Sequence, residues 1–194
     1  MSFARWFSRS VDATFLAAVG DIRRFRTARG LVGYLGLDPR VRQSGSEPAR
    51  GGRISKRGSA SVRWALVEAA WSVVHQPGPL HAFYQRIRAR RGHGIAVVAV
   101  ARKLAVLFWC LLSRSEDYAH QQPSLTAKKL RLLEIRAGAP TLKGTNTGTW
   151  ATRQKMRKAE RELAQQAEAS YKRTVSDWQA APKKAGASVT PGRA

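Results

Sequence analysis

The residues best suited to chemistry in this sequence are a serine and the arginines beside it. Ser44 lies in the string RVRQSGS, with Arg40 and Arg42 just before it. A serine hydroxyl is a weak nucleophile, so attack on a phosphodiester needs activation and a way to stabilise the charged transition state. Guanidinium groups meet the second need, because one guanidinium group can donate two parallel hydrogen bonds to phosphate oxygens. The same loop could clamp a phosphate without any chemistry, and the residues alone favour that interpretation at least as much.

Further basic residues follow Ser44, and a second serine competes with it. The neighbouring glycines let the backbone come close to a sugar–phosphate chain. Ser46 is only two residues away and is a rival candidate for the nucleophile. The basic residues predicted to bind nucleic acid are Arg40, Arg42, Arg53, Lys56, Arg57 and Arg63.

Neither the histidines nor the carboxylates are spaced for a metal site. The histidines are scattered along the chain, at His75, His81, His93 and His120. No His or Cys pair has the spacing of metal ligands. The stretch from Glu68 to Glu116 holds no other acidic residue, and Glu116-Asp117 is the one adjacent acidic pair in the predicted core. We therefore expect this chain to bind no cofactor and to lack a two-metal phosphoryl-transfer site of its own.

The charge of the chain points to a polyanionic partner. Lys and Arg number 35 against 12 Asp and Glu, which gives a formal net charge of +23 over 194 residues. In a compact fold, so many positive charges repel one another and destabilise the folded state. Nucleic acid fits best as the partner, since each neutralised phosphate releases a condensed counterion.

A membrane is the other polyanionic surface to consider. Residues 95–112 form an apolar run of nearly spanning length. However, Arg102 and Lys103 lie at its centre, and each costs about 2.5–3.5 kcal/mol in a bilayer. We expect a buried or docking helix here and no membrane partner. The single Cys110 excludes an internal disulfide and suits a reducing cytoplasm.

The pattern of apolar residues favours an all-α fold. Residues 40–58 lack helical spacing and are rich in Gly, Ser and Arg, so they are predicted to form a basic loop, with no strand expected. Thr27 and Ser124 are expected to cap the helices that follow them. The core is expected between residues 11 and 138. Helices are predicted over residues 11–19, 27–35, 59–75, 80–91, 95–112, 124–135 and 150–178.

Three long strings of the sequence carry a family resemblance. They are GDIRRFRTARGLVGYLGLDPRVRQSGS, GGRISKRGSASVRWALVEAAW and AVAVARKLAVLFWCLL. Together they resemble the C-terminal, serine-bearing domain of Piv/MooV-type insertion-sequence transposases, the bridge-RNA-guided recombinases. The resemblance is dense over residues 14–138 and weaker in AEASYKRTVSDW.

The resemblance implies a function and a partner. The serine of the family's SG motif falls on Ser44, which would form a covalent phosphoserine link to DNA. A RuvC-like domain with four acidic residues would hold Mg²⁺, so the metal is expected only together with that partner. The composite site implies assembly around DNA and guide RNA with other protomers, as a homo-oligomer or with intact transposase copies. The stretch ISKRG would lie along the nucleic-acid path.

The sequence also departs from the family pattern. Nothing resembles the acidic RuvC-like half, and MSFARWFSRSVDA replaces an expected helix-hairpin-helix segment, so we expect a truncated, late-starting or degenerate copy that is inactive alone. The alternatives are a non-catalytic nucleic-acid-binding remnant and a basic RNA-binding protein. The predicted division is an atypical segment (1–13), the serine domain (14–138), a linker (139–149), a charged helix (150–180) and a disordered tail (181–194).

Overall fold

The computed structural model describes residues 9–43, 50–116, 118, 120, 123–140 and 150–180. Almost all of the regular structure in these ranges is helical, which confirms the predicted fold class. The helices are α1 (Arg9–Val19), the 3-10 helix η2 (Ile22–Arg24), α2 (Ala28–Tyr34), α3 (Ala60–Val74), α4 (Pro79–Arg91), α5 (His93–Arg114), α6 (Pro123–Arg136) and α7 (Trp150–Ala180).

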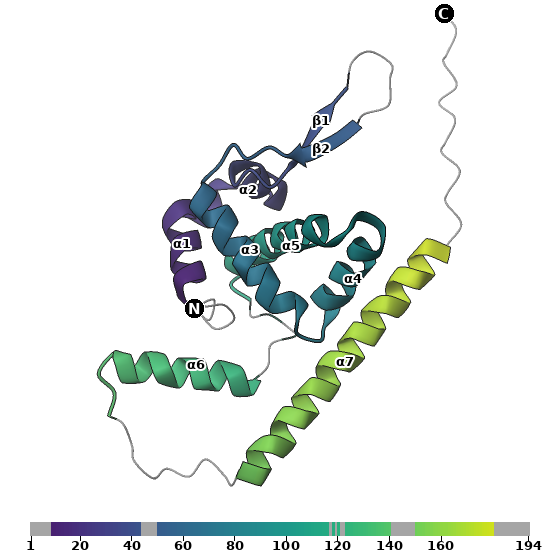
Figure 1. The fold of residues 1–194 in the computed structure, drawn as a ribbon. Coiled ribbons are helices and arrows are strands. Elements are labelled where there is room, and N and C mark those ends of the chain that lie inside the picture. Colours follow the sequence, from purple (N-terminus) through teal and green to yellow (C-terminus); the bar gives the residue numbers. More distant parts are fainter. Residues whose placement is uncertain are drawn as a thin grey trace, which may run out of the picture.

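Helix α5 lies at the centre, and η2, α2, α3 and α4 pack against it (Figure 1). One face of α5 is fully apolar and buried, through residues that include Val100, Leu104 and Phe108. Phe108 meets Phe15 of α1 edge to face, with ring centroids 4.9 Å apart. By length and composition α5 could also cross a membrane. Because one face of α5 is buried in the helical core, the packing of the core also accounts for the apolar composition of this helix.

The ends of the helices follow local capping chemistry. The Thr27 hydroxyl accepts from Gly30 N at 3.2 Å, as predicted. Ser59 caps α3 in the same way, through Val62 N. Asp21 caps η2 by accepting from Arg23 N. Because these side chains satisfy amide groups that a first turn leaves without partners, the sequence locates the starts of α2 and α3.

Two expectations about the elements were wrong. Residues 40–58 are not only loop: β1 (Pro39–Arg42) and β2 (Arg50–Ile54) form an antiparallel hairpin. The register slips between Pro39, which faces Ile54, and Val41, which faces Gly51. Val41 is exposed and only Ile54 is partly buried against the core, so the period-2 pattern that would have predicted the strands is missing.

The second correction concerns the last two helices. Helix α6 begins at Pro123, so Ser124 lies inside its first turn and does not precede it as a cap. The buried apolar cluster runs from Val11 to Phe108, short of the predicted limit at residue 138. Helix α7 is mostly exposed, as expected, but it also packs along α4 (Figure 1).

Candidate nucleic-acid interface

The hairpin projects from the body above α2, and its base is tied to the segment that follows α2 (Figure 1). Ser55 N donates to Asp38 O at 2.8 Å, and Lys56 N donates to Gly36 O at 3.0 Å. The buried Ser55 hydroxyl also donates to Asp38 Oδ1 at 2.5 Å. These bonds continue the pairing of the strands into the body. They fix the base of the hairpin, which we call the root, between Gly36 and Asp38 on one side and Ser55 and Lys56 on the other.

Two glycines allow the root to close. A Cβ at Gly58 would lie 2.0 Å from Tyr34 O. A Cβ at Gly36 would lie 2.6 Å from Arg57 N, and Gly36 has a left-handed φ of +68°. Only glycine permits this approach of one backbone to another. The orientation of the hairpin therefore depends on these two positions.

Two of the predicted phosphate-binding arginines hold backbone carbonyls at this root. Arg63 is half-buried, and its Nη1 donates to Gly58 O at 2.5 Å and to Leu35 O at 3.3 Å. Arg40 Nη2 donates to Ser55 O at 3.1 Å. Both guanidinium groups thus support the hairpin, and for Arg63 this structural role uses part of its hydrogen-bonding capacity. Phosphate binding by either stays a prediction.

The other described cations of the hairpin are open to solvent. Arg53, Lys56 and Arg57 are all exposed. Lys56 has a left-handed φ of 58°, which turns the chain sharply as it leaves β2. No carboxylate in the described ranges forms an ion pair with any of the three. Their charges are available to a partner.

The proposed nucleophile lies outside the described residues. Ser44 and its rival Ser46 fall in the sequence between the end of β1 at Arg42 and the start of β2 at Arg50. The backbone of Arg42 belongs to β1, but its side chain is not among those described. The structure brings Arg40, Arg53, Lys56, Arg57 and Arg63 onto the hairpin and its root, and it leaves the serine assignment as a prediction.

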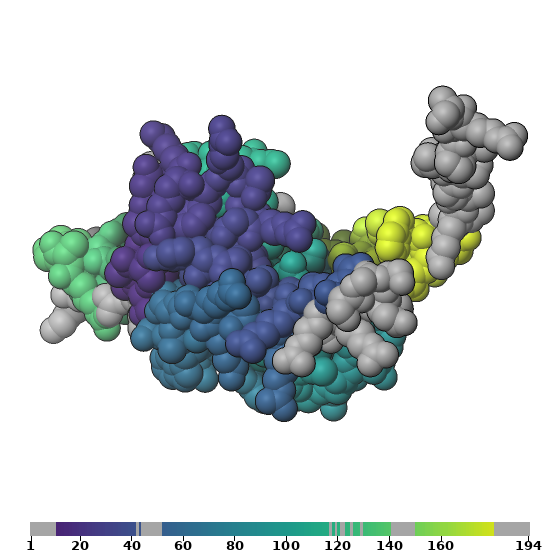
Figure 2. All heavy atoms as spheres, turned by 90° about the horizontal axis from the view of Figure 1, so that it is seen from above, coloured from purple at the N-terminus to yellow at the C-terminus, as the bar shows by residue number. Residues whose placement is uncertain are grey.

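Sequence reasoning missed a second group of cations, which lies around η2. The segment around η2 carries four exposed arginines: Arg23, Arg24, Arg26 and Arg29. In the view from above, the N-terminal helices and the hairpin strands appear on one face (Figure 2). Arg24 also lies over the rings of Phe25 and Tyr34, at 4.7 and 4.5 Å. The string RRFRTAR could have signalled this cluster, since four arginines lie within seven residues.

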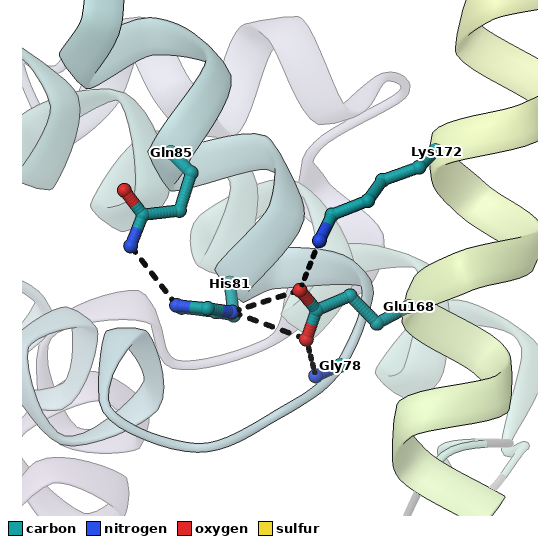
Figure 3. A network of polar contacts seen from close by, with 5 residues as sticks. All are labelled: Gly78, His81, Gln85, Glu168 and Lys172. Carbon is teal, nitrogen blue, oxygen red and sulfur yellow. Dashed lines mark hydrogen bonds and ion pairs between the residues drawn. The ribbon is translucent and has the colours of Figure 1, made fainter.

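Away from the hairpin, a buried carboxylate joins α7 to α4 (Figure 3). Glu168 accepts hydrogen bonds at 3.1 Å from Gly78 N, at the start of α4, and from His81 Nδ1. Lys172 Nζ lies 2.7 Å from its Oε1. Gly78 offers no side-chain cap to α4, so the carboxylate from α7 caps that helix instead. His81 looks isolated in the sequence, because its partner Glu168 is 87 residues away.

The pKa of Glu168 records these contacts. Burial raises it, but hydrogen bonds from Lys172, His81 and Gly78 outweigh burial and leave the pKa below its ordinary value of 4.5. A lowered pKa in the folded state means that the carboxylate stabilises the contact above pH 4.5. That stabilisation is lost as the pH falls through the folded-state pKa.

We expect Glu168→Gln to loosen α7 from α4 at neutral pH. Hydrogen bonds to a charged group contribute about 1.5–3 kcal/mol, so amides on the α4-facing side of α7 should exchange at least about tenfold faster. Hydrogen exchange read by mass spectrometry measures this change. The exposed Glu162 provides a matched control, and Glu162→Gln should leave exchange unchanged. Equal exchange in the two variants would contradict the anchoring role.

Within the described ranges, no three His, Cys, Asp or Glu side chains gather as metal ligands. The fold and the charge thus define a class: a cationic helical domain that presents a basic hairpin on a rigid root. Residues 7–85, which contain the hairpin, match the family described as "Transposase IS116/IS110/IS902 family". This part of the chain is therefore similar to the transposases of that family.

Curated proteins that are similar to this chain are also named as transposases. The chain is 38% identical over 106 residues to a "Probable family 20 transposase" of Pseudomonas aeruginosa, covering 53% of this chain and 31% of the relative. It is 36% identical over 106 residues to the "Transposase for insertion sequence element IS1111A" of Coxiella burnetii, covering 53% and 29%. It is 34% identical over 133 residues to "Putative transposase y4qE" of Sinorhizobium fredii, covering 53% and 34%. The chain therefore spans about a third of the length of these relatives.

Proposed function

We propose that this chain takes part in DNA transposition and binds DNA through the hairpin β1–β2. The observation that carries the proposal is the fixed root of a cationic hairpin inside the transposase segment. A hairpin held by Asp38, Ser55 and Arg63 presents its charges in one orientation, so fewer degrees of freedom are lost on binding. The four exposed arginines around η2 add further positive charge within the matched segment.

The resemblance to the bridge-RNA-guided subtype supports a more detailed proposal. Ser44 Oγ attacks a strand phosphorus, the Oγ–P bond forms as the P–O bond to the leaving strand breaks, and the proton of the hydroxyl leaves with a base. Arginine side chains near the hairpin stabilise the phosphate charge. Guide RNA, a second polyanion, would occupy the remaining cationic surface.

The Mg²⁺ that such chemistry uses does not fit the described residues, which offer no cluster of oxygen or nitrogen ligands. In this proposal the metal belongs to a RuvC-like partner, and the serine domain acts within a composite site. The chain described here supplies phosphate binding and the candidate nucleophile.

The hairpin is tested by replacing Arg53, Lys56 and Arg57 together with Ala. Three exposed phosphate contacts contribute about 3 to the slope of log K against log salt, so the variant should bind duplex DNA and structured RNA more weakly and with a shallower slope. Fluorescence anisotropy over a salt series measures both quantities. The thermal midpoint should stay unchanged, because all three side chains are exposed.

A charge-preserving variant is the control. Arg53→Lys, Lys56→Arg and Arg57→Lys keep the charge, so they should keep the salt slope of the wild-type chain. If the wild-type affinity does not respond to salt, the electrostatic proposal fails. If the Ala variant loses stability while each folded molecule binds normally, the hairpin is a structural element and not a contact surface.

A further inference from the structure

Helix α7 lies beyond the matched transposase segment and carries a second concentration of positive charge. Its first twelve residues contain five cations: Arg153, Lys155, Arg157, Lys158 and Arg161. The single acidic residue in this stretch is Glu160. Residues 151–159 are exposed without exception, so this part of α7 stands clear of the described body.

The acidic residue of this stretch is already engaged elsewhere. Glu160 accepts from Ser124 N at 2.8 Å and from the Ser124 hydroxyl at 2.5 Å, at the start of α6. Within the described ranges, none of the five cations forms an ion pair. The inward-facing carboxylates thus serve as helix caps, and the positive charge outside is left uncompensated.

The spacing of the cations makes the free helix unfavourable by itself. Arg153, Arg157 and Arg161 follow one another at four-residue intervals, and Lys155 and Lys158 are three apart. Like charges at these spacings destabilise a helix, because the side chains lie next to one another on its surface. A polyanion laid along the helix would turn this repulsion into attraction.

Two anchors hold this basic stretch in position. Glu160 joins α7 to α6, and eight residues later Glu168 joins it to α4 (Figure 3). Because these contacts already hold the helix in position, less entropy is lost when its cations bind a partner. In Figure 1 this end of α7 lies at the opposite end of the molecule from the hairpin.

We propose that the basic stretch of α7, residues 150–161, is a second surface for the phosphate backbone of a nucleic-acid duplex, separate from the hairpin. The inference rests on the proposed nucleic-acid function and adds a site to it. Three arginines at four-residue intervals span about 12 Å of helix, over which a duplex presents about seven phosphate charges. A lipid surface fits less well, because an interfacial helix needs a broad apolar face and this stretch offers only Trp150 and Met156 as large apolar residues.

The test replaces Arg153, Lys155, Arg157 and Lys158 with Gln in the full chain. Gln keeps helix propensity and removes four charges. The slope of log K against log salt for a duplex long enough to reach both ends should fall by about 3.6 if all four cations contact phosphates, and the loss should add to that of the hairpin variant. The control exchanges Arg for Lys and Lys for Arg at the same four positions and should retain the wild-type slope.

The outcomes separate this inference from the proposed function. If the hairpin variant weakens binding and the α7 variant matches the wild type, the α7 surface is not used and the function of the hairpin stands. If the wild-type chain binds no duplex, both proposals fail. A parallel series with vesicles of anionic phospholipid addresses the lipid alternative: vesicle binding lost with the four Gln substitutions, with DNA binding unchanged, would overturn the assignment to nucleic acid.

Discussion

Ser44→Ala is expected to abolish covalent attachment of this chain to DNA and to leave DNA binding nearly intact. The hydroxyl that would form the phosphoserine bond is removed, while the cations of the hairpin are kept. The measurement is a denaturing gel of labelled DNA after protease treatment, in a reaction that also contains a RuvC-like partner, matching guide RNA and Mg²⁺. The chain alone should give no adduct, since its described residues hold no metal-ligand cluster.

Ser46→Ala is the matched control for this experiment. If adducts survive in Ser44→Ala but vanish in Ser46→Ala, the nucleophile lies two residues further along. If the wild-type chain forms adducts without a partner, the composite site is wrong. Adducts that persist in both variants would show that neither Ser44 nor Ser46 is the nucleophile.

Gly58→Ala is expected to cost about 3 kcal/mol of folding stability or more. The new Cβ would lie 2.0 Å from Tyr34 O and 2.7 Å from Leu35 C, and both are backbone atoms that a rotamer change cannot move. Overpacking of this kind typically costs about 1–3 kcal/mol, and a clash with backbone lies at the upper end. For a chain of this size the thermal midpoint should fall by about 10 °C, as measured by circular dichroism.

Gly33→Ala supplies the control within the same region. A Cβ at Gly33 meets nothing within 4 Å, and the residue lies in α2, so alanine should stabilise the chain by about 0.5–1 kcal/mol. Equal midpoints for the two variants would show that the root of the hairpin is not closely packed. DNA binding by the folded fraction of Gly58→Ala should also weaken, because the hairpin loses its fixed orientation.

Much of the helical framework could be predicted from the sequence because its signals are local. The apolar spacing of Val62, Leu66 and Ala69 marks α3, and the Ser59 cap and Pro77-Gly78-Pro79 bound it. Thr27 marks the start of α2 in the same way. The positive charge is likewise a property of composition, so the expectation of a polyanionic partner needs no fold.

The hairpin required the tertiary structure. Strands that read PRVR and RGGRI have no alternation of apolar residues, and their pairing depends on Ser55, Asp38 and the two glycines at the root. The hydrogen bonds of Arg63 to Leu35 O and Gly58 O are equally invisible in a linear sequence. The positive charge of Arg63 suggested only phosphate binding, whereas the structure shows that this arginine also holds the hairpin in place.

The sequence by itself determined most of the helices, the local caps of α2 and α3 and the excess of positive charge, because each of these follows from residues within a turn or two, or from composition. Only the tertiary structure decided where that charge is presented. Glu168 meets Gly78 and His81 across a separation of about ninety residues, and Glu160 meets Ser124 across 36. Such pairs form because polar groups that become buried when the helices pack need hydrogen-bond partners. A local sequence pattern does not show which distant residue will be the partner.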